Sequence, residues 1–345
     1  MEALDYNPVH PPSIYLWERT EGKMLLIKRL LKSVVFIGKI SDPQRRTFVP
    51  YGTGFLFSVF HDDIRFDYVV TCHHVIESIE GDAVWVRLNV KDDKGGAQFV
   101  ELNIPKHAQS IRVEKSSWIC DSKQDIAVLS QEIGDLADVT RIVEKDVITK
   151  NNIFALHGGI LPGEITWLVG LFTSHYGITH NLPIIRLGNI AALPEELIFT
   201  ETGYVKAYLV ETRSIGGLSG SPVFINKGSG YWPNTSEDER IASLFLGMMR
   251  GRLNTQDAND VVAGDSIADT INSGMGVVIP SEDIMNFINK PEFDEQRKKT
   301  VEQLKKKSHF RPTAAIPVAD NPQHKEDFNS LLTAATKKKP PADET

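Results

Sequence analysis

Three short segments, far apart in the chain, carry side chains that could together cleave an acyl bond. In the first, Ser219 stands between two glycines in the string Gly217-Leu218-Ser219-Gly220-Ser221-Pro222, which leads into an apolar run at 223–225. Glycines let the backbone turn outward, so such a loop exposes a serine hydroxyl and frees backbone N–H groups for a substrate oxygen. The pattern indicates a nucleophilic serine, with the N–H groups of Gly217 and Ser219 as donors.

The other two segments supply the partners that such a serine needs. An apolar run at 68–71 leads to His74, and Asp125 stands at the head of the apolar run 126–129. The order is therefore His, Asp, Ser, with separations of 51 and 94 residues. An α/β-hydrolase would run Ser, acid, His, and a subtilisin-like enzyme would run Asp, His, Ser, so only the chymotrypsin-like order fits.

Each assignment has a simpler alternative. His73 adjoins His74 and would point to the opposite face of an extended segment, although the register of the segment favours His74. A Ser-Gly-Ser-Pro string is often only a turn. An aspartate before an apolar run, such as Asp125, is often a surface residue at the start of a strand. Found together in this order, the three segments favour catalysis.

The same segments resemble motifs of the trypsin/chymotrypsin-like serine peptidases, and most closely those of the bacterial HtrA/Deg-type protease domain. The resemblance covers residues 35 to 285. Its matches are the family strand G-S-G-F at 52–55, T-A-x-H-V at 71–75, D-x-A-V-L at 125–129, G-N-S-G-[GS]-P at 217–222 and, more weakly, G-[IL]-G-F-A-I-P-S at 274–281.

The resemblance implies a serine endopeptidase that hydrolyses peptide bonds through an acyl-enzyme, without metal or other cofactor. Ser219 would attack the carbonyl, His74 would take its proton and later protonate the leaving group, and Asp125 would hold the imidazole. The N–H groups of Gly217 and Ser219 would form the oxyanion hole. The alternative is a catalytically weak or inactive protein of the peptidase fold that acts as a protein-binding or regulatory module.

Substrate specificity is predicted from three further positions. In the family, the residue six before the nucleophile lies at the base of the specificity pocket; here it is Arg213, followed by Ser214. Arg250 lies in a segment similar to the strand that forms the pocket wall. We expect these residues to bind substrate and to favour Glu or Asp before the cleaved bond. Alternatively, Arg213 points to solvent or pairs with Glu211.

The middle of the chain predicts an all-β fold. Short β-rich stretches alternate with clusters of Gly, Pro, Asn and Asp, without helices between them. We expect two six-stranded antiparallel β-barrels of the chymotrypsin type, with the site in the cleft between them. The first, 33–137, would carry the histidine and the aspartate, and the second, 138–290, the serine, the oxyanion hole and the pocket.

Both ends are predicted to be extensions of these barrels. Residues 1–32 would form an N-terminal helical extension, with an amphipathic helix over 24–31. Helices are also expected over 282–288 and 291–307, and 291–345 would be a charged helix followed by a disordered tail. That tail is too short and too poor in apolar residues to be the PDZ domain that HtrA proteins usually carry.

Composition narrows the class of protein. The chain has 345 residues, 41% of them hydrophobic, and a net charge of −7, and its mean hydropathy is −0.19. These values are typical of a soluble globular protein, and no apolar run is long enough to span a membrane. Two cysteines, Cys72 and Cys120, argue against a disulfide framework and are expected to be small buried thiols.

These observations lead to expectations about location and partners. We see no secretory signal and so expect a cytoplasmic protein, in a bacterium on the family resemblance. The negative net charge argues against nonspecific binding to nucleic acid. The expected partners are a protein or peptide substrate and, through the termini, a regulatory protein, with no membrane or nucleic acid.

Overall fold

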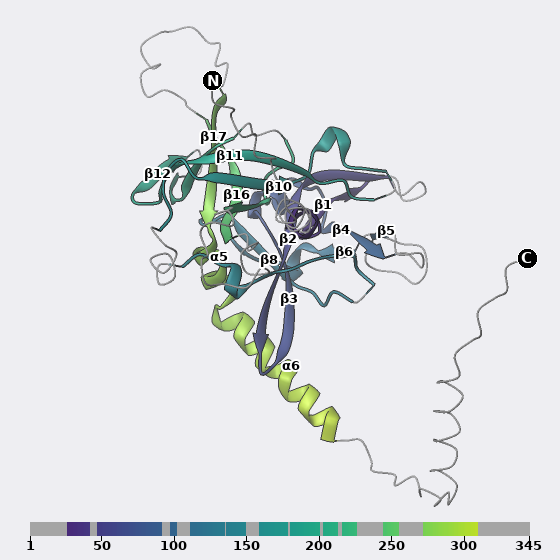
Figure 1. Cartoon of the computed structure of the whole chain (residues 1–345). Coiled ribbons are helices and arrows are strands. Elements are labelled where there is room, and N and C mark those ends of the chain that lie inside the picture. The colour runs from purple at the N-terminus through teal and green to yellow at the C-terminus, as the bar shows by residue number, and fades with distance from the viewer. Residues whose placement is uncertain are drawn as a thin grey trace, which may run out of the picture. The chain divides into compact units, whose positions relative to one another are not determined.

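Strands dominate the structure, a computed structural model shown in Figure 1. The residues that it describes are 26–41, 47–91, 97–101, 111–134, 136–149, 159–178, 180–200, 203–212, 216–225, 244–254 and 272–309. The chain as far as Lys298 forms one compact unit and residues 299–345 form another. The candidate site lies wholly in the first unit.

The first sheet contains nine strands in the main order β5-β4-β1-β2-β3-β8-β7, with β6 on β4 and β9 on β2. The strands are β1 (Val34–Ile40), β2 (Phe48–His61), β3 (Ile64–Thr71), β4 (Ala83–Lys91), β5 (Ala97–Glu101), β6 (Ile111–Glu114), β7 (Ile119–Asp121), β8 (Ile126–Ser130) and β9 (Ile142–Val143). All neighbours pair antiparallel except β2 and β9, which are parallel.

This first sheet differs from the closed six-stranded barrel that the sequence predicts. Strands β5 and β6 both pair with β4, and within the described residues no ladder joins either of them to β7 at the other end. The sheet is therefore a half-barrel. It also extends past the predicted boundary at 137, because Ile142 of β9 pairs with Phe57 of β2.

The second sheet is the closed six-stranded antiparallel barrel that the sequence predicts, in the order β10-β11-β14-β17-β16-β15. A separate two-stranded hairpin, β12 and β13, is inserted between β11 and β14. These strands are β10 (Ile165–Gly170), β11 (Ile184–Ala192), β12 (Leu197–Thr200), β13 (Gly203–Lys206), β14 (Tyr208–Glu211), β15 (Pro222–Ile225), β16 (Leu244–Asn254) and β17 (Asn272–Pro280).

Helices complete the fold: those at 26–31, 281–288 and 291–309 lie near predicted positions, whereas 73–78 is helical where an extended segment is expected. Residues 26–31 are helical, where a helix over 24–31 is expected. The other helices are α2 (His73–Ser78), α5 (Ser281–Ile288) and α6 (Pro291–His309), together with the single 3-10 turns η1 (Lys115–Ser117), η2 (Glu144–Asp146) and η3 (Thr173–His175). The predicted disordered tail lies outside the described residues. Within those residues, no helix has both the length and the apolar character needed to cross a bilayer.

The beginning of α6 is attached to the first sheet. Its Phe293 ring meets Tyr68 of β3 edge-on, with ring centroids 5.5 Å apart. The buried Arg297 donates from Nη1 to the Tyr68 hydroxyl at 2.9 Å and to the Ile288 carbonyl at 3.1 Å. The chain that leaves the second barrel therefore returns to the first sheet and ties the two together.

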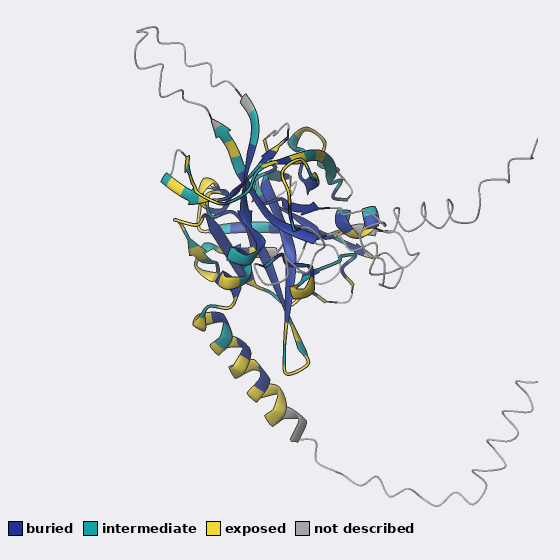
Figure 2. Ribbon diagram, turned by 60° about the vertical axis from the view of Figure 1, so that its left-hand side comes forward, coloured by how far each residue is buried: buried dark blue, intermediate teal, exposed yellow. Residues whose placement is uncertain are grey.

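An aromatic cluster joins the two sheets directly. The buried Phe245 of β16 lies 5.2 Å from Phe55 and 6.4 Å from Phe57 of β2, and 5.8 Å from Phe224 of β15, measured between ring centroids. Buried residues concentrate in the strands at this junction (Figure 2). Because closely packed apolar groups resist sliding, this cluster fixes how the half-barrel and the barrel dock.

Candidate active site

The histidine of the site lies in the first turn of the short helix α2, immediately after β3. The residue at the N-cap position, Cys72, makes no side-chain capping hydrogen bond. Asp125 caps the helix from a distance instead: its carbonyl accepts from the His73 N–H at 3.3 Å and its Oδ1 from the His74 N–H at 2.9 Å. These bonds satisfy donors that a helix start leaves unpaired, and they bring Asp125 to His74.

Asp125 also binds the His74 ring. Its Oδ2 lies 2.8 Å from His74 Nδ1. Burial by itself would raise the pKa of Asp125, but the hydrogen bonds and charge of His74, with the charge of Arg250, outweigh it and hold that pKa below its ordinary value. An ionised carboxylate can only accept, so Nδ1 carries the proton, and in the neutral imidazole Nε2 then keeps its lone pair. This is the tautomer that a general base requires.

The neighbouring histidine is directed elsewhere. His73 Nε2 lies 3.5 Å from Oε1 of Glu77, one helical turn further on. The sequence suggested an extended segment in which His73 and His74 face opposite ways. In the helix they diverge by about 100° instead, which is enough to send one ring to Glu77 and the other to Asp125.

The backbone at Asp125 itself is unusual. Its φ is +58°, in the left-handed region that aspartate tolerates better than most residues. The turn lets one residue present its carbonyl and both carboxylate oxygens to α2.

The Ser219 loop is held on both sides of the serine. Leu218 is fully buried in the core of the second barrel, and Ser221 is fully buried as well. The Ser221 N–H donates to the Leu218 carbonyl at 3.0 Å, and the Gly220 N–H donates to Met249 of β16 at 2.8 Å. Ser219, between these anchors, is only partly buried.

The backbone donors predicted for an oxyanion hole lie on this loop. Gly217 has φ +93°, which turns its peptide in a way that a side chain would resist. Among the described residues, the N–H groups of Gly217 and Ser219 have no hydrogen-bond acceptor. Both therefore remain available for a substrate oxygen.

Thr53 of β2 clamps the same loop from the first sheet. Its N–H donates to the Ser219 carbonyl at 2.9 Å. Its hydroxyl donates to the Gly217 carbonyl at 2.8 Å and accepts from the Leu171 N–H at 2.9 Å. The Thr71 hydroxyl in turn donates to the Thr53 carbonyl at 2.7 Å. The sequence showed Thr53 only as part of a strand motif and carried no signal of this role.

The relation between His74 and Ser219 differs from that between His74 and Asp125. Among the residues that the structure describes, no hydrogen bond joins the His74 ring to the Ser219 hydroxyl. The His74 side chain is 48% exposed, so solvent or a ligand can reach it. The structure thus pairs the histidine with the aspartate and fixes the serine loop, without a direct bond between histidine and serine.

Of the three residues predicted to bind substrate, the structure describes Arg250. Arg213 and Ser214 lie outside the described residues. Arg250 is buried, and its Nε donates to Asp125 Oδ2 at 3.2 Å. This differs from the expectation that Arg250 meets an acidic substrate side chain, because the guanidinium is already engaged by the aspartate. Sequence spacing could not reveal the contact, since it crosses between the two sheets.

The cysteines also take different roles. Cys72 is buried and its thiol lies 3.3 Å from the Met249 carbonyl, whereas Cys120 on β7 is exposed, contrary to the expectation of a buried thiol. Burial, and then the charge of Asp125, raises the pKa of Cys72 well above its ordinary 9.0, so this thiol is neutral.

Cys72, His74 and Asp125 each bring one donor atom to within 4.8 Å of the others. A metal ion here would have to displace the Arg250 cation from Asp125 and remove the thiol proton. Both steps oppose cation binding. The arrangement suits proton transfer better than metal coordination.

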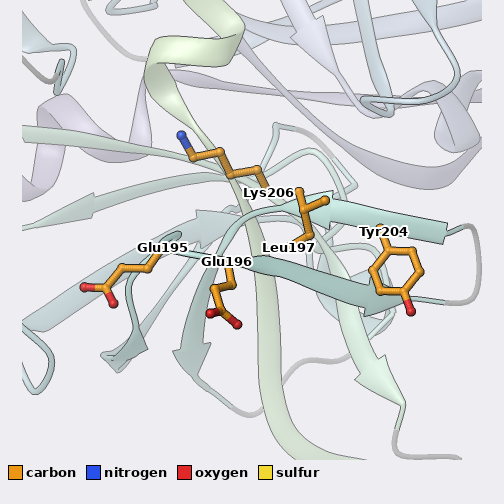
Figure 3. A pocket seen from close by; sticks show the side chains of 5 residues that line it. All are labelled: Glu195, Glu196, Leu197, Tyr204 and Lys206. Atoms are coloured by element: carbon orange, nitrogen blue, oxygen red, sulfur yellow. The ribbon is translucent and has the colours of Figure 1, made fainter.

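A surface pocket of about 520 Å³ lies at the hairpin β12–β13, apart from this cluster. Figure 3 shows the side chains that line it, Glu195, Glu196, Leu197, Tyr204 and Lys206. Leu197 and Tyr204 are 61% and 70% exposed. The hairpin contacts the site through Thr200, whose hydroxyl lies 3.3 Å from Arg250 Nη1.

Gly220 is predicted to be essential to the docking of the loop. Its φ is +84°, and a Cβ there would collide with the Thr53 carbonyl and lie 2.5 Å from the Thr71 hydroxyl. Gly220→Ala is therefore expected to lower the free energy of unfolding by about 3 kcal/mol or more, through backbone strain plus this clash. Urea unfolding monitored by tryptophan fluorescence measures the change.

Gly163→Ala is the matched control. Gly163 has φ +90°, but a Cβ there would meet no atom within 4 Å. We expect it to cost only the backbone strain, about 1 kcal/mol. Equal losses in the two variants would contradict the proposed clash between the loop and β2.

Comparison with known proteins gives no sequence match and only distant structural matches. No protein-family model and no curated protein sequence matches the chain. Among solved structures, the chain is similar to the MamO protease domain from Magnetospirillum magneticum, with 12% identity, a TM-score of 0.42, and coverage of 76% of this chain and 98% of that one. It is also similar to the inactive form of the Rv3671c protease, with 15% identity, a TM-score of 0.41, and coverage of 82% and 98%. The closed barrel and the half-barrel packed on it agree with the two-barrel arrangement that the sequence predicts, except that the first sheet is open.

Proposed function

We propose that the protein is a serine endopeptidase of the trypsin-like, HtrA-related type that acts through His74, Asp125 and Ser219. The observation that carries the proposal is the 2.8 Å bond from His74 Nδ1 to a buried Asp125 carboxylate, which leaves Nε2 free to act as a base. The Thr53 clamp supports it, because it holds the Ser219 loop against the sheet whose β3 leads directly into α2.

The proposed reaction uses these groups in sequence. His74 Nε2 removes the Ser219 proton as the Ser219 oxygen bonds to the peptide carbonyl carbon, and the N–H groups of Gly217 and Ser219 bind the resulting oxyanion. The imidazolium then protonates the leaving amine as the C–N bond breaks. Water, deprotonated by His74 in its turn, hydrolyses the acyl-enzyme and restores Ser219.

The proposal extends to the substrate and the partners. The substrate would be a protein or peptide in a bacterial cytoplasm, without metal, nucleic acid or membrane. A preference for Glu or Asp before the scissile bond would now rest on Arg213 and Ser214, because Arg250 pairs with Asp125. A regulatory partner would act through the termini.

A fluorophosphonate probe tests the proposal. We expect it to form an oxygen–phosphorus bond at Ser219 with loss of fluoride, and to label the native protein but not Ser219→Ala. Ser221→Ala is the control: its hydroxyl is buried and has no hydrogen-bond partner among the described residues, so its loss should leave labelling and folding unchanged. Labelling that persists in Ser219→Ala would assign the nucleophile to another residue.

A second candidate is a peptidase-fold protein that binds other proteins without cleaving them. The observation in its favour is that no hydrogen bond joins His74 to Ser219 in the described part of the chain. This candidate predicts that the folded native protein is not labelled by the probe, even at high probe concentration. The two candidates thus give opposite results in one experiment.

A further inference from the structure

Arg250 of β16 places a buried cation against the carboxylate of Asp125. Its Nε donates to Asp125 Oδ2 at 3.2 Å, and the two side chains are only 9% and 7% exposed. The same oxygen accepts from His74 Nδ1 at 2.8 Å. A permanently charged group therefore shares the oxygen that orients the proposed general base.

Two further contacts fix this arrangement. Arg250 Nη1 donates to the Thr200 hydroxyl at the end of β12, at 3.3 Å. The other carboxylate oxygen of Asp125 accepts from the His74 N–H at 2.9 Å. Because a buried guanidinium is costly unless it is paired, the ion pair persists as long as the fold does. The carboxylate is thus held from both sides and cannot rotate away from the imidazole.

Among the described residues, the other groups that pack on α2 do not place an equivalent charge against the His74 ring. On α2 itself, His73 pairs with Glu77, and Lys115 donates to carbonyls at the C-terminal end of the helix. Gly52, which faces α2 from β2, is uncharged, and β8 has the sequence IAVLS, without a charged side chain. The Cys72 thiol is buried and neutral. The carboxylate and the guanidinium are therefore the charges that bear most directly on the ring.

We propose that Arg250 is a positioning residue for the His74–Asp125 pair and that its charge disfavours the protonated form of the His74 imidazole. The proposal rests on the proposed function. A lone carboxylate would favour an imidazolium beside it, whereas the ion pair of Asp125 and Arg250 is neutral overall. The arginine therefore offsets the charge that the carboxylate alone would place beside the ring.

The direct test is an NMR titration of the His74 ring in the full-length Ser219→Ala protein, which needs no catalytic activity. Replacing Arg250 by Gln in that background keeps a hydrogen-bond donor and removes the charge. We expect the titration midpoint to rise by about one pH unit. An unchanged midpoint, or one that falls, would overturn the proposal.

Two variants separate charge from structure. Arg250→Lys retains the cation and should keep the midpoint near that of the parent protein, whereas a rise as large as that of Arg250→Gln would contradict the role of charge. Thr200→Val removes the Nη1 anchor but not the cation, and should likewise leave the midpoint in place. If Arg250→Gln does not fold, Arg250→Met, an apolar replacement of similar length, carries the same expectation.

Activity gives a second, independent readout. In protein with Ser219 intact, the acidic limb of the plot of kcat/KM against pH should move to higher pH in Arg250→Gln, by the same amount as the NMR midpoint. In Arg250→Lys it should lie at the pH found for the native protein. Absence of any peptide cleavage or probe labelling would defeat the proposed function alone, because the NMR titration still reports on Arg250. A titration shift without a matching shift of the acidic limb in active enzyme would defeat the assignment of His74 as the base.

Discussion

Replacement of Ser219 by alanine is expected to lower kcat for peptide hydrolysis by as much as about a million-fold, because it removes the atom that forms the acyl-enzyme. Binding should change little, since the Gly217 and Ser219 N–H groups are backbone groups and the Thr53 clamp from β2 contacts only backbone carbonyls of the loop. The measurement is the initial rate of cleavage of a fluorogenic peptide, with a parallel binding assay on the same peptide.

The control lies two residues further along the same loop. Ser221 is fully buried, and Ser221→Ala should retain most of the kcat of the native protein. A Ser219→Ala protein that keeps more than about a hundredth of the native kcat would show that the hydrolysis does not proceed through this serine.

Asp125→Asn is expected to lower kcat by about ten thousand-fold. One carboxylate oxygen accepts from the His74 N–H and the other from His74 Nδ1 and Arg250 Nε. An amide has only one oxygen, so in either orientation its NH2 group faces another N–H donor and one of these hydrogen bonds is lost. With the NH2 group toward the ring, it favours the tautomer in which Nε2 carries the proton and cannot act as a base. The kcat at the pH optimum measures the loss.

The fold should survive this substitution, because asparagine also tolerates the left-handed backbone at position 125. The Tm of Asp125→Asn checks this point. Asp121→Asn is the matched control: Asp121 pairs with Lys290 at 3.3 Å, outside the site, and its variant should keep native kcat. A loss smaller than about tenfold in Asp125→Asn would mean that the aspartate does not orient the base.

Much of the fold is visible in local patterns. Short apolar stretches separated by turn residues predict strands, and a closed barrel of six strands is found where they were expected in the second half. The helices α5 and α6 also begin within a residue of the predicted positions. The half-barrel is harder to foresee, because two strands that pair with successive stretches of one edge of β4 leave no trace in either strand's own sequence.

The candidate site likewise contains residues that local sequence patterns reveal and residues that they do not. His74, Asp125 and Ser219 stand out through their residue types, their neighbours and their order, all of which are written along the chain. Arg250 does not stand out, because its role depends on its contact with Asp125, which lies 125 residues away in the chain. Thr53 and Gly217, 164 residues apart, meet only once the two sheets have docked.

By itself, the amino-acid sequence determined the all-β class and the order of the candidate site residues, since each follows from residue type and short-range periodicity. The tertiary structure decided which histidine meets the aspartate, which threonine clamps the serine loop, and that an arginine shares the aspartate with the histidine. The threonine and arginine contacts arise where the two sheets pack together, and the histidine contact arises within the first sheet, where α2 meets the residue before β8. Close packing selects side-chain partners by distance in space and not by separation along the chain.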